Sequence, residues 1–419
     1  MKKLYIFLTY NIARVGGIET YVAGKTAYLK ENGWAVKVLY HGFHHVKSLY
    51  ENLDEFEDGA FPEFTCPPFQ MSRKSVVRSL DRMVRYIGDC SGYDTVYMES
   101  HDDRLSQWGE LIAERIGAKH LIILLNERYR GADRYYADKI DFYNFKHERG
   151  EVRGDVTLAR LFEGFREITE ADYRPFHFNE SPVADVRCPA VEALKKADWN
   201  ICYIGRFIKP YVPAILQGVK RFAAQHSDRQ IQLLIVGDTS ARGTLAQDTF
   251  TDSENVSVVE LGNLIPIPRS LYRKVDVVIA GSGSARCSAQ EGALTIIADP
   301  DLCKATGLLG YETRDTVFWN GVSPLTGFDE ALERTLIQKV YENLTYDYRE
   351  PTVEECCRQN FEAFQNCGLV REYYGLEKMC AGKKSPKRVA EYRFKTILYR
   401  LAPSAISKWQ KLRAKVKNA

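Results

Sequence analysis

Two cations follow a short apolar run in the second half of the chain. Residues 201–209 read ICYIGRFIK, so Arg206 and Lys209 come just after an apolar segment that ends at Gly205. A buried strand ending there would place both side chains at the carboxyl edge of a parallel sheet, where open α/β sheets bind ligands. A guanidinium fork and an ammonium group suit the oxygens of a diphosphate. We interpret the pair as an anion site; the alternative is a surface ion pair.

A second candidate for binding phosphate is the run GSGS at residues 281–284. It follows the apolar run 275–280 and precedes a predicted helix over residues 285–291. Glycine lets the backbone approach a ligand, and a helix N-terminus directs N–H groups at an anion. We therefore predict that Ser282, Gly283 and Ser284 contact phosphate. The alternative is that Ser284 is only an N-cap.

Three further features follow predicted strands of the first half. Gly16 and Gly17 close the loop after residues 4–9, where they form either a ligand-approach loop or a tight turn. His101 follows the strand over 94–99 and is predicted to contact substrate; the alternative is a helix start flanked by acids. Glu127 follows the strand over 120–125 and is predicted to be a catalytic carboxylate at the edge facing an interdomain cleft.

The elements that would position these residues alternate between strand and helix. The first series has predicted helices over 18–32 and 103–116 and predicted strands over 4–9, 35–40, 94–99 and 120–125. The second series has strands over 200–204, 231–236, 256–261, 275–280 and 295–298. Such alternation predicts parallel sheets covered by helices. At 419 residues the chain suits two doubly wound domains, over 1–188 and 189–380.

The last 39 residues, 381–419, differ from the rest in charge. They contain 12 Lys and Arg against one acid, while the remaining chain has 46 Lys and Arg against 54 acids. Bulky apolar residues such as Trp409 recur among the bases, which predicts an amphipathic segment that binds an anionic membrane surface. The alternatives are an RNA-binding tail or a helix packed on the body. We expect no nucleic-acid partner.

Cysteine usage and hydropathy indicate a compartment. Ten cysteines show no CxxC pair or regular spacing, which is typical of scattered thiols in a reducing cytosol. The opening apolar run, residues 4–9, is too short for a signal peptide, and no run reaches transmembrane length. We expect a cytoplasmic protein that is peripheral at the inner face of the plasma membrane.

Four segments together resemble the family 4 glycosyltransferases, which have the two-domain GT-B fold. They are GGIETYVAGKTAYLKENGWAVKVLYH at 16–41, YIGRFIKPYVPAILQGVKRF at 203–222, LLIVGD at 233–238 and LYRKVDVVIAGSGSARCSAQEGALTIIAD at 271–299. The resemblance implies a retaining, metal-independent enzyme of the bacterial surface-polysaccharide type. It also implies that residues 1–188 form the acceptor-side domain and residues 189–380 the nucleotide-sugar donor domain. The enzyme would take a UDP- or GDP-linked sugar as co-substrate without another cofactor, and a lipid-linked or glycan acceptor. Gly16, Gly17 and Arg206 match family positions near the donor phosphates.

The chain departs from the family pattern at two places. Tyr211 stands where the family has a lysine, five residues after the matching arginine, and Lys209 is the candidate substitute. Of the family's two glutamates, one position falls on Cys287 and the loop for the other is shortened, which leaves Glu291 as the nearby carboxylate for substrate binding. These departures keep two alternatives open: a non-catalytic scaffold of a glycan-assembly complex and a nucleotide-sugar epimerase.

Overall fold

The computed structural model divides the chain into two compact units, Met1–Glu180 with Thr352–Ala419 and Ser181–Pro351. Each unit is described by itself. The structure describes residues 1–12, 16–42, 48, 50–101, 103–125, 139–154, 162, 183–313, 319, 323–349, 351–366, 372–381, 386, 389–390, 393–394 and 397.

The first unit contains a five-stranded parallel sheet in the order β2-β1-β3-β4-β5. The strands are β1 (Lys3–Thr9), β2 (Trp34–Tyr40), β3 (Thr95–Ser100), β4 (Lys119–Leu124) and β5 (Val152–Gly154). The first four confirm the predicted strands to within a residue or two. Strand β1 is buried on both faces, as its almost unbroken apolar sequence requires.

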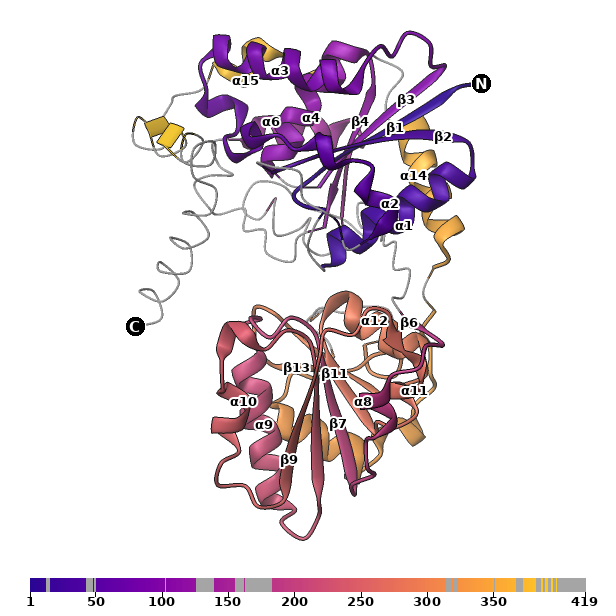
Figure 1. The fold of residues 1–419 in the computed structure, drawn as a ribbon, viewed down its shortest axis with the longest axis vertical. Coiled ribbons are helices and arrows are strands. Elements are labelled where there is room, and N and C mark those ends of the chain that lie inside the picture. The colour runs from indigo at the N-terminus through magenta and orange to yellow at the C-terminus, as the bar shows by residue number, and fades with distance from the viewer. Residues whose placement is uncertain are drawn as a thin grey trace. The chain divides into compact units, whose positions relative to one another are not determined.

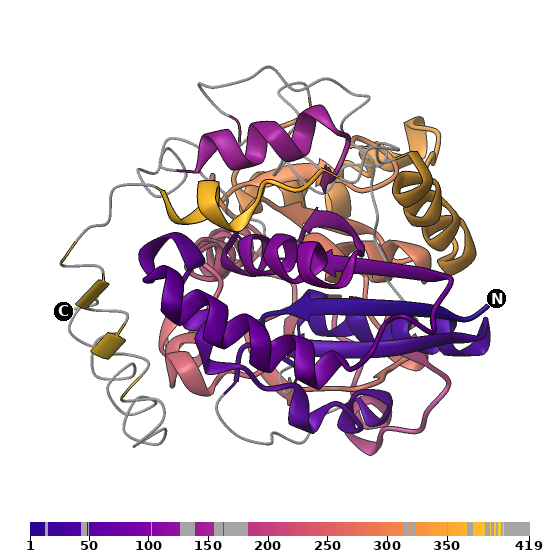
Figure 2. The same cartoon turned by 90° about the horizontal axis from the view of Figure 1, so that it is seen from above.

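Helices cover both faces of this sheet (Figures 1 and 2). Tyr5 and Phe7 of β1 share a core with α1 (Gly17–Glu31) and α14 (Val353–Asn366). Leu4 and Ile6, on the opposite face, share a core with α3 (Arg73–Ile87), α4 (Asp103–Ile116) and α6 (Ile140–Glu148). The bounds of α4 are those predicted from the sequence.

The region between β2 and β3, which shows no clear periodicity, forms short helices and then α3. The short ones are α2 (Glu51–Asp54) and the 3₁₀ turns Glu57–Gly59, Pro62–Thr65 and Pro68–Gln70. Ser72 caps α3 by accepting from the Ser75 amide at 3.3 Å, and Gly88 ends it with φ of 91°.

The chain returns to the first unit after residue 351, which differs from the expected boundary at 380. Helix α14 begins with a capping box, in which Thr352 N donates to Glu355 Oε2 at 2.8 Å and Glu355 N donates to Thr352 Oγ1 at 3.1 Å. Phe361 stacks on Trp34 of β2, and the short helix α15 (Leu376–Cys380) follows. Burial of these aromatic rings explains why the segment leaves the second unit.

The second unit contains a six-stranded sheet in the order β13-β12-β11-β7-β8-β9, parallel except for β13. The strands are β7 (Trp199–Ile204), β8 (Ile231–Val236), β9 (Val256–Gly262), β11 (Val277–Ala280), β12 (Thr295–Ala298) and β13 (Ala305–Leu308), with β6 (Val183–Ala184) and β10 (Ile267–Pro268) paired separately. All five predicted strands are therefore confirmed.

Two helices of the second unit, α9 (Val212–Gln225) and α13 (Phe328–Leu332), pack in one core with β7 and β8. The other described α-helices of this unit are α8 (Pro189–Glu192), α10 (Leu245–Thr249), α11 (Arg269–Tyr272) and α12 (Ser282–Gln290). The described residues also form the 3₁₀ turns Ser240–Arg242 and Val340–Asn343 and the π-helix Glu333–Ile337.

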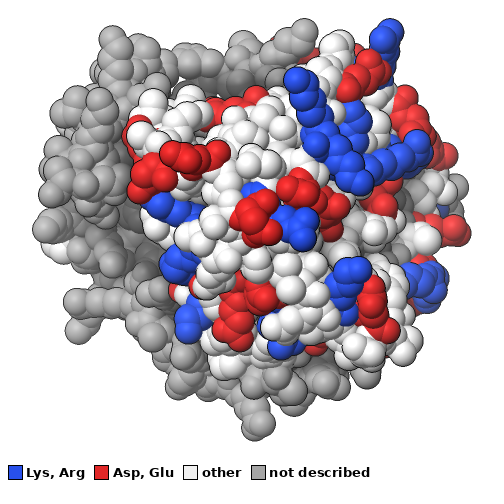
Figure 3. Space-filling model, turned by 90° about the horizontal axis from the view of Figure 1, so that it is seen from below, with Lys and Arg blue, Asp and Glu red and all other residues white. Residues whose placement is uncertain are grey.

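Lys, Arg, Asp and Glu all occur on the face that holds the amino edge of the second sheet (Figure 3). There Arg229 lies 3.7 Å from Asp198 and 3.6 Å from Asp228. Opposite charges thus meet at this edge. In the described part of the chain, no helix is long and apolar enough to cross a membrane.

Candidate functional site

Three loops meet at the carboxyl edge of the second sheet, because they follow three neighbouring strands. Ile204 of β7 is in register with Ala280 of β11 and with Val236 of β8. The loops after these strands carry Arg206 and Lys209, the helix start at Ser282, and the turn that ends at Arg242. Adjacent strands are about 5 Å apart, so the loops are neighbours.

Two glycines let the loops after β7 and β8 touch. Gly205 has φ of 154° and Gly237 has φ of 147°, conformations that favour glycine. A Cβ atom on Gly237 would lie 2.0 Å from the carbonyl oxygen of Gly205. Any side chain at Gly237 would therefore force apart the backbone segments that carry the cations.

Arg206 and Lys209 lie on a tight turn whose backbone is held from two sides. The Lys209 amide donates to the Arg206 carbonyl at 3.0 Å, and the Tyr203 hydroxyl donates to the same oxygen at 3.0 Å. Arg206 is exposed and Lys209 is half-buried. The structure thus brings the two predicted cations together on one turn at the sheet edge.

Tyr211, which stands where the resemblance implies a lysine, is buried beneath this edge. It is 3% exposed, and its hydroxyl would lie 2.8 Å from a Cβ atom on Gly281. Burial, reinforced by Tyr211, raises the pKa of Tyr203 well above 10. The two tyrosines therefore lie between the Arg206 turn and the start of α12, and the hydroxyl of Tyr203 is neutral.

Helix α12 begins at Ser282, not after Ser284 as predicted. Its N-cap is Gly281, with extended backbone and no side-chain capping bond, so the Ser284 N-cap alternative is wrong. The short loop results because β11 ends at Ala280 and the chain turns at once through Ser282, whose φ is 53°. Ser282, Gly283 and Ser284 form the first turn, where amide N–H groups have no intrahelical partner.

Arg242 also belongs to this edge, although the sequence analysis did not single it out. Its Nη2 donates to the carbonyls of Ile208 at 3.3 Å and Lys209 at 3.2 Å. Arg242 ends a short 3₁₀ turn after β8. Its position after a strand at the same edge is the one local signal that could have identified it.

Glu291 is not brought to the cations. It lies at the C-terminal end of α12, nine residues beyond Ser282, which corresponds to about 13 Å of helix. Arg269 donates to its carboxylate through Nε at 2.7 Å and through Nη2 at 3.3 Å. This bidentate pair gives Glu291 a structural partner, and its predicted role in substrate binding gains no support from the geometry.

In the first unit, Gly16 and Gly17 open helix α1. Gly16 is the N-cap and its carbonyl accepts from the Thr20 amide at 2.9 Å. Neither glycine has a positive φ, and a Cβ atom on Gly17 would meet no described atom within 4 Å. Neither backbone strain nor the described packing explains Gly17, so close approach of a ligand stays a prediction.

His101 follows β3 but is fully buried. Its Nε2 lies 2.5 Å from Glu99 Oε1, and the other carboxylate oxygen of Glu99 accepts from Lys25 at 2.5 Å and from Tyr5. Burial alone raises the pKa of Glu99, but Lys25 and His101 outweigh it and hold that pKa at about 2. His101 therefore belongs to a buried ionic network, and a contact with substrate stays a prediction. Glu127 lies outside the described residues.

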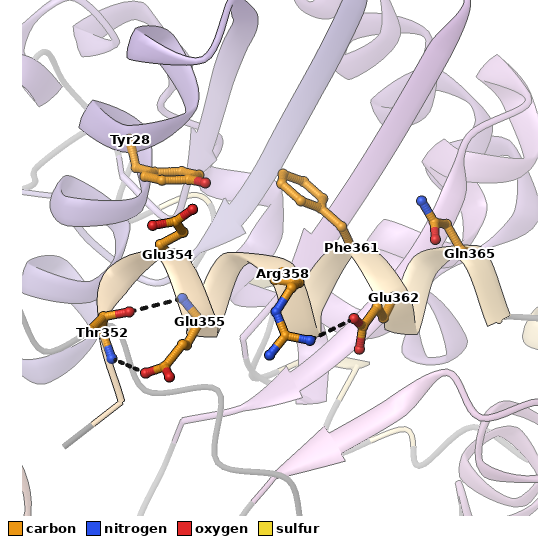
Figure 4. Close-up of a pocket in the computed structure, with 8 residues that line it drawn as sticks. All are labelled: Tyr28, Thr352, Glu354, Glu355, Arg358, Phe361, Glu362 and Gln365. Atoms are coloured by element: carbon orange, nitrogen blue, oxygen red, sulfur yellow. Dashed lines mark hydrogen bonds and ion pairs between the residues drawn. The ribbon is translucent and has the colours of Figure 1, made fainter. Parts of the chain in front are cut away.

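A pocket in the described residues runs along α14 of the first unit and has a volume of about 710 Å³. Figure 4 shows Tyr28 of α1 facing Glu354 of α14, and Arg358 paired with Glu362 at 2.9 Å. Its lining has Glu354, Glu355 and Glu362 against the single cation Arg358. This excess of carboxylates makes it a poor site for a nucleoside diphosphate.

Comparisons with known proteins show what the chain resembles. No protein-family model matches it, and no curated protein matches its sequence. The structure of a protein from Listeria monocytogenes assigned as a UDP-N-acetylglucosamine 2-epimerase matches with a TM-score of 0.50 at 12% identity, and the match covers 86% of this chain and 95% of that chain.

Two further solved structures match slightly less well. A UDP-GlcNAc 2-epimerase from Neisseria meningitidis bound to UDP-GlcNAc has a TM-score of 0.49 at 13% identity, covering 87% of this chain and 100% of that one. The lipopolysaccharide outer core galactosyltransferase WaaB has a TM-score of 0.48 at 13% identity, covering 87% and 97%. The Listeria match shows the fold: the chain has the predicted GT-B fold of two Rossmann-like domains.

Proposed function

We propose that this protein is a glycosyltransferase that moves a sugar from a UDP- or GDP-linked donor to a hydroxyl group of a lipid-linked or glycan acceptor. The observation that carries the proposal is the carboxyl edge of the second sheet. There, Arg206 and Lys209 share one turn next to the amides that open α12. Cations and helix amides at adjacent strand ends suit a diphosphate.

The chemistry proposed for this edge is electrostatic. As the bond between the sugar and the diphosphate breaks, negative charge grows on the departing phosphate oxygens. Donors already held in place stabilise that charge without rearranging during the reaction. Arg206 and Lys209 supply positive charge, and the first turn of α12 supplies N–H groups. Retention of configuration is the family property implied by the resemblance, and we propose it here.

Two alternatives differ in what they require. The match to the Listeria protein favours a nucleotide-sugar epimerase as the second candidate, because that protein is assigned this activity and shares the fold. An epimerase would convert the nucleotide sugar without an acceptor. A scaffold would release no sugar product at all, and the engagement of Glu291 by Arg269 is the feature that favours it.

The test uses the full chain. Calorimetric titration with UDP and GDP measures donor-site binding, and incubation with radiolabelled UDP- or GDP-sugars measures turnover with and without lipid-linked and glycan acceptors. We expect binding of at least one nucleoside diphosphate and a labelled product only when an acceptor is present. Conversion of the donor without an acceptor would favour the epimerase, and nucleotide binding without any turnover would favour the scaffold.

A further inference from the structure

Arg242 is tied to the turn that carries the two predicted phosphate ligands. It donates from one nitrogen, Nη2, to the Ile208 and Lys209 carbonyls, across 33 residues of sequence in the second case. The contact of Gly237 with Gly205 brings the loop that carries Arg242 against this turn. The guanidinium is therefore held at the sheet edge.

The remaining donors of Arg242 lack partners in the described part of the second unit. A guanidinium has five N–H groups, and the two carbonyls occupy Nη2. Nε is buried without a hydrogen-bond partner, and Nη1 makes no hydrogen bond with the described residues. Leaving the buried Nε donor unpaired costs free energy, which an acceptor such as a phosphate oxygen would offset.

The local charge is also uncompensated. Within the described residues, no carboxylate lies within ion-pair distance of Arg206 or Arg242, and Asp238, the nearest acid in sequence, accepts from the Ser240 amide at 2.9 Å. Arg206 and Arg242 both act electrostatically on the Tyr203 hydroxyl, so they lie near the same point. Two cations held close together without a protein anion favour an anionic ligand.

We propose that Arg242 is a third phosphate-binding cation of this edge, held by the Ile208 and Lys209 carbonyls so that its remaining N–H groups meet a diphosphate. This inference rests on the proposed function, since it assigns a further residue to the same nucleotide site. Because the three cations come from two loops, a diphosphate can contact more of them than a monophosphate can. The site should therefore prefer nucleoside diphosphates to nucleoside monophosphates.

The experiment titrates UDP, GDP, UMP and inorganic pyrophosphate into the full chain and its variants by calorimetry. Arg242→Ala should weaken UDP and pyrophosphate binding about tenfold or more, with a smaller effect on UMP. Arg242→Lys, which keeps the charge, should recover part of the affinity, and Arg242→Gln should not. Arg229→Ala is the matched control, because it removes one cation from the opposite end of β8. Thermal melting checks that each variant is folded.

The possible outcomes distinguish a failure of this inference from a failure of the proposed function. If the wild-type chain binds none of the four probes, both fail. If it binds UDP and Arg242→Ala binds UDP equally well, only the role of Arg242 fails. An equal loss toward UDP and UMP, not relieved by lysine, would show a purely structural role and would also overturn the inference.

Discussion

Charged side chains occur in two different environments in this protein. In the second unit, Arg206 is exposed at the end of a strand, where a ligand can reach it. In the first unit, Lys25 and Glu99 form a fully buried ion pair at 2.5 Å, and Asn360 of α14 accepts from the same ammonium group at 3.1 Å. The exposed charge suits binding, whereas the buried pair ties together segments of the fold.

The Arg206 side chain is the most direct test of the donor site. Arg206→Ala should weaken UDP or GDP binding by about 1.5–3 kcal/mol, which is the usual range for a hydrogen bond to a charged group. Calorimetry of the full chain measures the change, with Arg229→Ala as the control at the other edge of the sheet. Unchanged affinity in Arg206→Ala would remove this residue from the site.

A second prediction at this scale concerns His120, which is buried between Glu110 and Ser100. Burial, together with Lys146, lowers the pKa of His120 to about 4. The unfolded chain takes up a proton near pH 6.5, whereas the folded protein does so only near pH 4. The contribution of His120 to the free energy of unfolding is therefore at its maximum above pH 6.5 and declines as the pH falls toward 4.

Urea unfolding at pH 7, 5.5 and 4.5 measures this effect. We expect the free energy of unfolding to decrease by about 1–3 kcal/mol over that range through His120, since one pKa unit corresponds to about 1.4 kcal/mol. His120→Asn removes the titrating ring and should flatten the dependence, even though the variant is less stable overall. The same slope in both proteins would contradict the assignment.

At the scale of elements, the N-terminus of α12 is the part of the donor site that requires backbone geometry. The chain passes from β11 into the helix through Ser282, whose φ is 53°, and no side chain caps the first turn. The first four N–H groups of a helix lack intrahelical partners, so they are available to a phosphate. The N-terminus of α14 differs from that of α12, because its capping box already provides hydrogen-bond acceptors for the amides of Thr352 and Glu355.

Ser284→Pro tests this element. Proline in the first helical turn is tolerated but removes the N–H group at position 284, so we expect donor binding to weaken by at least about 1.5 kcal/mol. Ser284→Ala is the matched control, since it removes only the hydroxyl and should have the smaller effect. A proline variant that melts normally and binds UDP or GDP like the wild type would exclude these amides from the site.

At the scale of the whole molecule, charge is unevenly distributed along the chain. Residues 381–419 carry 12 Lys and Arg and one acid, whereas the rest of the chain has eight more acids than bases. Most of this segment lies outside the described residues, so its membrane role stays a proposal. Polybasic segments gain on the order of 1 kcal/mol per cation close to an anionic membrane.

Vesicle co-sedimentation tests the segment. The full chain should bind vesicles that contain anionic lipid, and a version that ends at Cys380 should not, because it loses the charge and the apolar residues around Trp409. Neutral vesicles and RNA are the controls. Equal binding by the two versions, or stronger binding of the full chain to RNA than to anionic vesicles, would count against a membrane surface as the partner.

The last prediction concerns metal dependence of the complete reaction. If the negative charge of the diphosphate is stabilised by Arg206, Lys209 and the α12 amides, turnover should need no divalent cation. Transfer assayed in EDTA should then keep most of its rate. Loss of transfer that magnesium or manganese restores would show that the cations described here are insufficient.

Local patterns in the sequence are enough to predict much of this fold. Apolar runs predict β1, β7 and β8 because a strand buried on both faces has mostly apolar residues at successive positions. The placement of Arg206 and Lys209 at a sheet edge also follows from sequence, since a residue just after a parallel strand must lie at its carboxyl end. Strand alternation likewise predicts two doubly wound sheets.

Only the tertiary structure decided which distant residues meet. Arg242 reaches Lys209 across 33 residues, and Asn360 reaches Lys25 across 335. Neither contact can be predicted from a periodic pattern in the sequence, because each depends on how separate elements pack and not on residues that are neighbours in sequence. The same holds for Glu291: the sequence places it near the GSGS run, but the length of α12 and the partner Arg269 hold it at the other end of the helix.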